Sequence, residues 1–340
     1  MTQLFSHLRV SSEYSISQGL LTVDQIVDNA IRNSVPSVAL TDKSNMFGLV
    51  KFFNKCESAG IKPISGSSIR LIFDDDETSY ELLCLAKTNN GHKNLMKIIS
   101  NAHNNSSFNS PIIRFNDLIE LKDDIIVISG GKDSHIFEYL KSNNISDATK
   151  RIEDFRNNFG DNFVLDVQLT NRIDEIEYLK NVLPIAKDKG IPLIATNDVL
   201  FAEQDDYEIH ETKVCINTGK TLNDPNRERV FSEHQYFKSP QEMTELFKDY
   251  DSLIDNTNEI SKKCNVCLET KGYFLPEYPV PKKHNFDSFL KEISTQRIES
   301  YIKDFDSEKH SEYLDRLNYE LEQIKTMGFS SYFLIVYDFI

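Results

Sequence analysis

The stretch PSVALTDKSNMFG, at Pro36–Gly48, decides how the first part of this chain folds. Its apolar run, Val38–Leu40, follows a proline and has the length and composition of a fully buried strand. Thr41 and Asp42 come directly afterwards, at the point where that strand should end. Helical patterns lie on both sides of the stretch, which is therefore expected to be one β/α unit.

The same arrangement returns far downstream in IPLIATNDV, at Ile191–Val199, where Leu193–Ala195 leads to Asp198. A helical pattern, Ile173–Lys189, precedes it. Alternating strands and helices predict parallel β/α units, and such folds build their sites at the carboxyl ends of the strands. We therefore expect Asp42 and Asp198 to face one mouth.

Five further runs have strand character; the second and third are expected to form a hairpin across the acidic turn Asp74–Glu77, and helical patterns lie between most of the others. The five runs are Phe5–Val10, Pro63–Phe73, Tyr80–Ala86, Ile125–Ile128 and Phe163–Gln168. No Gly-rich dinucleotide loop follows the first of them. The predicted fold class is therefore α/β, a distorted β/α barrel of about seven strands rather than an open sheet.

Beyond Asp198 the strand pattern stops and helices are predicted. Their ranges are Asp205–Asn217, Gln241–Phe247, Leu253–Cys264, Asn285–Ile302 and His310–Met327. A proline-rich run, Tyr273–Pro281, is expected to be an extended connector, and His103–Ser110 a loop. The apolar end, Ser330–Ile340, indicates part of a longer protein.

Composition excludes several classes of protein. The chain has 340 residues, a formal net charge of −15 and 39% hydrophobic residues, which supports a real core and argues against a wide phosphate-binding surface. It shows neither an apolar run long enough to span a membrane nor a secretory signal. Five scattered cysteines indicate a reducing cytoplasm, and the lone pair Cys264 and Cys267 predicts free thiols rather than a metal site.

Several ordered motifs carry a family resemblance. They are HLRVSSEYS, VALTDKSNMFGLVKFF, AGIKPISGSSI, GHKNLMKIIS, IPLIATNDVLF, GYFLPEYPVP and MGFSSYFLIVYDFI. Together they resemble the N-terminal part of the catalytic α subunit of bacterial DNA polymerase III. The resemblance implies a polymerase-and-histidinol-phosphatase (PHP) domain over 1–270, a connector over 271–284, and the start of the polymerase palm over 285–340. It also implies a distorted seven-stranded barrel for the PHP domain.

Metal-active members of this family gather nine His, Asp, Glu and Cys ligands around two or three metal ions, and this chain departs from that set. The family's ligand positions fall here on Arg9, Ser11, Gln18, Lys43, Ser68, Glu81, Gly131 and Leu200, while Asp42 and Asp198 keep their carboxylates. Without imidazoles, the three carboxylates Asp42, Glu81 and Asp198 are weak candidates for a hydrated Mg²⁺ at best. We therefore expect neither a metal nor another cofactor in this part of the chain.

Two cations stand where the family has ligands. We expect Arg9 or Lys43 to neutralise the remaining carboxylates, and the specific hypothesis is that Arg9 pairs with Asp42 or Asp198. His7, beside the lost ligands, is expected to be a hydrogen-bonded core residue, and His210 to be a surface residue of its helix.

Three functions are compatible with these residues. The first is the N-terminal module of a replicative polymerase, with a degenerate metal site and a docking role for the separate proofreading exonuclease subunit. The alternative is a weak metal-dependent 3′–5′ exonuclease or phosphatase that uses the residual carboxylates. The third, a free-standing metabolic phosphatase, is disfavoured by the connector and the palm-like tail. By the resemblance, the Mg²⁺-binding polymerase aspartates lie beyond residue 340, together with the contacts to DNA and the sliding clamp.

Overall fold

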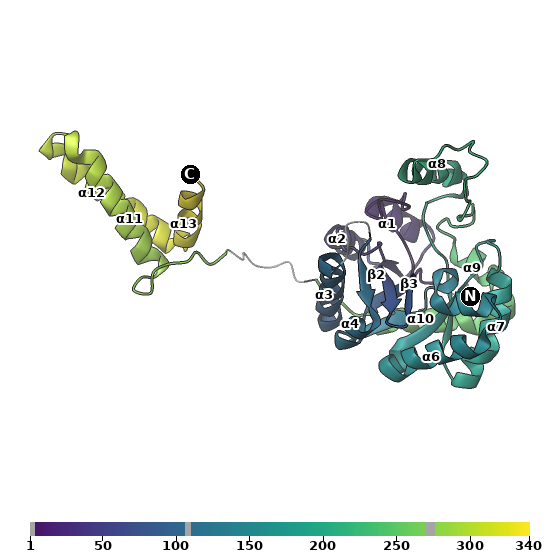
Figure 1. Cartoon of the computed structure of the whole chain (residues 1–340). Helices are drawn as coiled ribbons and strands as arrows, with labels where there is room; N and C mark the ends of the chain where they lie inside the picture. The colour runs from purple at the N-terminus through teal and green to yellow at the C-terminus, as the bar shows by residue number, and fades with distance from the viewer. Residues whose placement is uncertain (1–3, 106–109, 269–275) are drawn as a thin grey trace. The chain divides into compact units, whose positions relative to one another are not determined.

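The computed structural model describes residues 4–105, 110–268 and 276–340. The chain divides into two compact units, Met1–Leu268 and Glu269–Ile340 (Figure 1). The domain boundary predicted at 270 and the first residues of the predicted connector lie outside the described residues.

A seven-stranded mixed sheet forms the centre of the first unit, as Figure 1 shows. Its strands are β1 (Ser37–Leu40), β2 (Lys62–Phe73), β3 (Asp76–Ala86), β4 (Ile112–Arg114), β5 (Ile125–Ile128), β6 (Phe163–Gln168) and β7 (Leu193–Thr196). The order is β1-β2-β3-β5-β6-β7, with β4 paired to β2. Strand β3 runs antiparallel to both β2 and β5, and the remaining pairs are parallel.

The N-terminal segment joins the two ends of this sheet. Phe5–Val10, predicted as a strand, forms isolated bridges instead of a continuous ladder, because it contacts a different neighbour at each end. His7 pairs with Val38 of β1, and Val10 pairs with Val199 beyond β7. The sheet therefore curls into the distorted barrel that the sequence predicts.

Ten α-helices accompany the sheet within the described residues of the first unit. They are α1 (Val23–Arg32), α2 (Leu49–Ser58), α3 (Asn89–Asn105), α4 (Phe115–Glu120), α5 (His135–Lys141), α6 (Ile145–Phe159), α7 (Glu175–Lys189), α8 (Tyr207–Thr218), α9 (Pro240–Leu246) and α10 (Asp251–Lys263). Strand β5 shows how the core is shared between the two faces of the sheet. Ile126 and Ile128 belong to one buried cluster, whereas Ile125 and Val127 belong to the cluster that includes the helices α3 and α6. The two-residue period of a strand produces this division.

Two local predictions were wrong, and two short elements were not predicted. The unpredicted elements are β4 and α4, which are three and six residues long and too short to show a period. Of the predicted loop His103–Ser110, the first residues continue α3, and 106–109 lie outside the described residues. His210 is fully buried rather than exposed, because it packs against Phe201 and Phe231.

The second unit is helical, as predicted. It contains α11 (Phe286–Tyr301), α12 (Ser307–Thr326) and α13 (Ser330–Phe339), and Asn285 caps the first of them through a hydrogen bond from the Ser288 N–H (2.8 Å). Within the described residues of the whole chain, no helix combines the length and apolar character needed to cross a membrane.

Candidate functional site at the barrel mouth

Asp42 leaves the end of β1 and is held by a loop of serines. Its carboxylate accepts hydrogen bonds from the Ser12 N–H, the Ser12 hydroxyl and the Ser15 hydroxyl, each at 2.7 Å. Burial raises the pKa of Asp42, and these three donors offset part of that rise. Protein donors thus occupy three of the about four lone-pair sites of this carboxylate, which leaves little capacity for a metal ion.

Arg9 reaches across the barrel mouth between two carboxylates. Its Nε lies 3.1 Å from Asp198 Oδ1, and its Nη2 donates to Glu81 Oε1. The hypothesis of an Arg9 ion pair is confirmed for Asp198, whereas no contact with Asp42 is seen among the described interactions of Arg9. Burial of the guanidinium, with 3% of the side chain exposed, disfavours its charge, but the charges of Glu81 and Asp198 outweigh burial and raise the pKa of Arg9.

Glu81 is the most heavily paired carboxylate of the mouth. Besides Arg9, Lys43 Nζ lies 3.1 Å from Glu81 Oε2, and the Ser68 hydroxyl donates to Glu81 Oε1 at 2.7 Å. Burial alone would raise its pKa, but Lys43 and Arg9 outweigh it and lower the pKa of Glu81 to about 2. At neutral pH Glu81 is ionised, and the positive charges of Lys43 and Arg9 balance its charge. Because its pKa is so low, it is a poor general base.

Asp198, which follows β7, has a second partner that the sequence analysis did not find. Gln235 Nε2 donates to Asp198 Oδ2 at 2.8 Å, opposite the bond from Arg9. The next residue back, Asn197, accepts a hydrogen bond from Lys238 Nζ at 3.1 Å. The segment that follows α8 therefore helps to fix the end of β7.

Ser129-Gly130-Gly131 forms a tight turn after β5. Both glycines have positive φ, 95° and 57°. The Gly131 N–H donates to Asp166 Oδ1 at 2.7 Å, so it is committed to the protein. A Cβ at Gly131 would lie 2.8 Å from Gln168 Nε2, and the position thus requires glycine in this conformation. The turn has the structural role expected of it and does not present its amide to a phosphate.

The other predicted positions contribute to packing and backbone pairing. His7 is fully buried, and its Nε2 donates to the Lys238 carbonyl at 2.8 Å. The Ser11 N–H donates to the Val199 carbonyl at 2.9 Å. Leu200 is also fully buried, and its N–H donates to a backbone carbonyl at 2.9 Å. These three residues hold the barrel closed rather than line its cavity.

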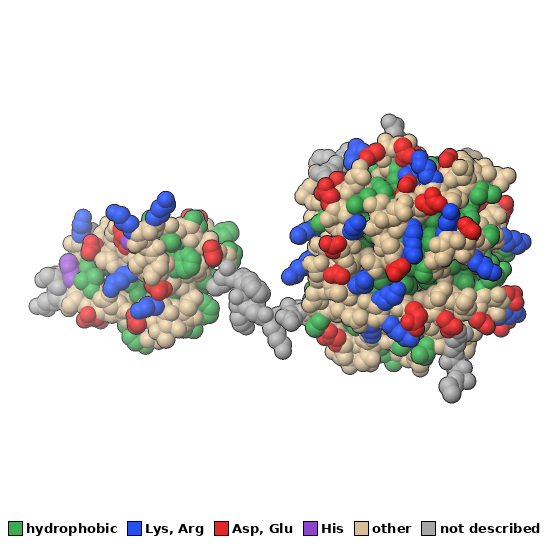
Figure 2. All heavy atoms as spheres, turned by 90° about the horizontal axis from the view of Figure 1, so that it is seen from below, with side chains coloured by type: hydrophobic (Ala, Val, Ile, Leu, Met, Phe, Trp, Pro, Cys, Tyr) green, Lys and Arg blue, Asp and Glu red, His purple; other side chains and the backbone are tan. Residues whose placement is uncertain are grey.

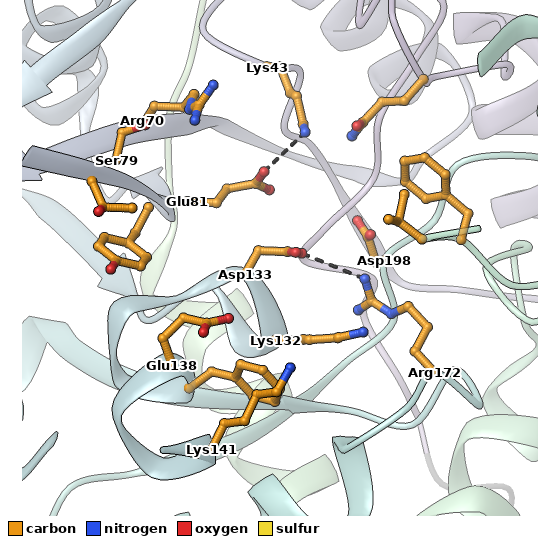
Figure 3. Close-up of a pocket in the computed structure, with 16 residues that line it drawn as sticks. Lys43, Arg70, Ser79, Glu81, Lys132, Asp133, Glu138, Lys141, Arg172 and Asp198 are labelled. Carbon is orange, nitrogen blue, oxygen red and sulfur yellow. Dashed lines mark ion pairs between the residues drawn. The ribbon is translucent and has the colours of Figure 1, made fainter. Parts of the chain in front are cut away.

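Several charged residues that line the mouth were not predicted from the sequence, and three of them, Lys132, Asp133 and Arg172, follow strands of the barrel. Figure 3 shows them together with Glu81 and Asp198 around a cavity of about 590 Å³. Arg172 Nη1 lies 3.6 Å from Asp133 Oδ2. Burial, followed by the nearby Arg172 charge, lowers the pKa of Lys132. All three follow β5 or β6, so the strand-end rule that identified Asp42 could also have found them.

Comparison with known proteins identifies the family. Residues 7–170 match the PHP domain family, and residues 288–340 match the family described as the bacterial DNA polymerase III alpha NTPase domain. The DNA polymerase III subunit alpha of Pseudomonas aeruginosa is 39% identical over 350 residues, and that of Escherichia coli K12 is 38% identical over 344 residues. The chain belongs to the DNA polymerase III alpha subunit family.

This member of the polymerase III alpha family spans only part of its relatives. The two alignments cover 100% and 99% of this chain and 30% of each relative. Among solved structures, an amidohydrolase from Chromobacterium violaceum overlaps 61% of this chain and 96% of its own, with 11% identity and a TM-score of 0.43. That overlap is too loose for any residue role to be carried over.

PHP-type folds imply a metal centre, and the residues of this polymerase III alpha barrel do not fit one. Within the described parts of the chain, no group of three or more His, Cys, Asp or Glu side chains is arranged to hold an ion. The carboxylates of Asp42, Glu81 and Asp198 instead accept hydrogen bonds from hydroxyls, amides and a guanidinium. An Arg side chain between two carboxylates also adds a positive charge that repels a divalent cation.

Proposed function

We propose that this chain is the N-terminal part of a bacterial replicative DNA polymerase, in which the barrel is a structural and docking domain. The alignment of essentially the whole chain with 30% of DNA polymerase III alpha subunits supports this proposal. The complete protein would carry out DNA-directed DNA synthesis in the cytoplasm. Its Mg²⁺ ions, and its contacts with DNA and the sliding clamp, would depend on residues beyond 340.

We further propose that the barrel mouth is a degenerate metal site without hydrolytic activity. The observation that carries this proposal is the Arg9 guanidinium between Glu81 and Asp198. A positive charge there neutralises both carboxylates, so the protein satisfies them without an ion. The nine-ligand set of metal-active PHP members has been replaced by an ion-pair network.

The same contacts leave Glu81 and Asp42 unsuited to activating water. Phosphoester hydrolysis needs a nucleophilic water made by a metal ion or by a general base with a pKa near neutrality. Glu81, with its pKa lowered to about 2, binds protons too weakly for that role. Asp42 already accepts three hydrogen bonds from protein donors. We infer that this part of the protein alone does not hydrolyse phosphoesters.

Loss of a built-in nuclease fits dependence on a separate one. We propose that the barrel carries the proofreading exonuclease subunit of the replicative polymerase. The surface charge argues against a direct DNA-binding role: the chain has a net charge of −15, and Figure 2 shows acidic and basic side chains interspersed on the displayed face of the larger unit. A wide phosphate-binding surface would require a continuous basic patch.

Release of nucleotides from a 3′-labelled single strand tests the proposed inactivity. The purified chain would be assayed with Mg²⁺, Mn²⁺ or Zn²⁺, alongside the Asp42→Ala and Asp198→Ala variants, and no release is expected. Release that disappears in both variants would establish the alternative, a weak metal-dependent exonuclease. Incorporation of nucleotides into a primed template by the same preparation would overturn the assignment of polymerase chemistry to residues beyond 340.

A further inference from the structure

An apolar groove lies outside the barrel mouth, between the loop that follows β1 and the C-terminal half of α3. Its volume is about 530 Å³. It is lined by Ser44, Asn45, Met46, Phe47, Met96, Ile99, Ser100, His103 and Asn104. None of its lining residues belongs to the cavity of the barrel mouth.

The groove is pre-formed because its loop is tied down on three sides. The Ser44 N–H donates to the Ser68 carbonyl at 2.7 Å, and His103 Nε2 donates to the Ser44 carbonyl at 2.8 Å. The Asn45 side-chain amide donates to the Tyr14 carbonyl at 3.1 Å. A binding site held in this way loses little conformational entropy when a partner enters it.

Apolar side chains in and beside the groove are left exposed to water. Phe47 is 73% exposed and Met96 44% exposed, and Val50, one turn further along, is 52% exposed. Phe47 is the one exposed aromatic side chain among the described residues of the first unit. Exposed aromatic and methionine side chains around a concavity are the composition of a protein-binding surface rather than of a solvated one.

The charge around the groove is opposite to that of the chain as a whole. The segments 43–55 and 89–105, which form both of its walls, contain no Asp or Glu, in a chain with 53 acidic residues. Lys93 and Lys97 lie one turn apart on α3, three residues before Met96 and Ser100, and form no ion pair within the described part of the chain. The groove therefore offers an apolar floor beside two unneutralised ammonium groups.

We propose that this groove is the docking site for an acidic segment of the proofreading exonuclease subunit. The segment would insert one or two apolar side chains between Phe47 and Met96 and place its carboxylates near Lys93 and Lys97. This inference rests on the docking role proposed above and gives that role a location. A nucleic acid is a poorer match, because two lysines beside an apolar floor supply few phosphate contacts.

Binding of the exonuclease subunit from the same organism, measured by biolayer interferometry, tests the location. Met96→Glu places a charge in the apolar groove. It should raise the dissociation constant by about tenfold or more, as loss of a central apolar contact does. Lys93→Glu combined with Lys97→Glu should slow association by about tenfold and remove most of its dependence on ionic strength. Ile176→Glu, at a 63% exposed position of α7, is the matched control and should bind like the wild type.

The outcomes separate the groove from the docking role itself. If the wild type binds and Met96→Glu binds equally well, docking occurs elsewhere and the groove assignment is wrong. If the wild type does not bind the exonuclease subunit, the docking role fails along with it. Binding that Met96→Glu abolishes but salt leaves unchanged would overturn the acidic character of the segment. Thermal unfolding of each variant checks that the surface substitutions leave the barrel folded, and Phe47→Ser offers a second test from the opposite wall.

Discussion

Replacing Arg9 by methionine should destabilise the barrel strongly. Methionine keeps much of the apolar length of the side chain but removes the charge shared by Glu81 and Asp198. The side chains of these two carboxylates are only 14% and 7% exposed, so water cannot solvate them fully. Removing one partner of a buried ion pair costs about 3–5 kcal/mol. Because Lys43 still lies 3.1 Å from Glu81, we expect a loss of about 3 kcal/mol, at the lower end of that range.

Urea denaturation followed by circular dichroism at pH 7.5 and at about pH 4.5 provides the assay. Burial raises the pKa of Glu81, but Lys43, Arg9 and the Ser68 hydroxyl together outweigh burial and lower it to about 2. In Arg9→Met the folded-state pKa of Glu81 rises, because one of its two cations is gone. At lower pH the Glu81 carboxylate becomes protonated and no longer needs that cation, so the variant regains part of the stability that it lost at neutral pH. The deficit of Arg9→Met relative to wild type should therefore shrink at about pH 4.5.

An exposed ion pair supplies the control for this experiment. Arg32→Met removes a pair with Glu203 whose side chains are 63% and 59% exposed, so the expected cost is below about 1 kcal/mol at either pH. A loss below about 1 kcal/mol for Arg9→Met, or an equal loss at both pH values, would refute the view that Arg9 neutralises buried carboxylates.

Three further predictions concern Asp42, His7 and the removal of metal ions. Asp42→Ala should lower the free energy of unfolding by about 2–3 kcal/mol, measured by thermal unfolding, because three donors of Ser12 and Ser15 lose their acceptor. Asp42→Asn keeps an acceptor and should lower it less. Equal losses in the two variants would contradict this role of Asp42. Burial lowers the pKa of His7 to about 4, below its unfolded value of about 6.5. As the pH falls, the unfolded chain therefore takes up a proton before the folded chain does. His7 alone should thus lower the free energy of unfolding by about 2 kcal/mol between pH 7 and pH 5. His7→Gln should reduce that pH dependence in urea titrations, and an unchanged slope would count against it. EDTA should leave the melting temperature of the chain unchanged, and a fall of several degrees would reveal a structural metal.

Much of the fold could be predicted because its strands are continuous apolar runs. Ile125–Ile128 and Leu193–Thr196 are buried along their whole length, as in strands covered on both faces. The closing segment Phe5–Val10 was harder, since its partners, β1 and the residues after β7, lie far apart in the sequence. Strand β4 is held by three residue pairs with β2, too few to leave a pattern.

The site was predictable in its positions but less so in its pairings. Strand-end reasoning located Asp42 and Asp198, and the cations expected at Arg9 and Lys43 pointed to an ion pair with a carboxylate. It could not decide which carboxylate Arg9 reaches, because that depends on how the serine loop before α1 folds around Asp42. Gln235, the second partner of Asp198, lies 37 residues downstream in a segment without a motif.

The central claim is that an ion-pair network has replaced the metal centre of the barrel mouth. Crystals of this chain soaked in Mn²⁺, with anomalous scattering recorded from the manganese, test it most directly. We expect no anomalous peak in the mouth and an Arg9 guanidinium that stays between Glu81 and Asp198. A manganese peak coordinated by Asp42, Glu81 or Asp198, with Arg9 displaced, would contradict it.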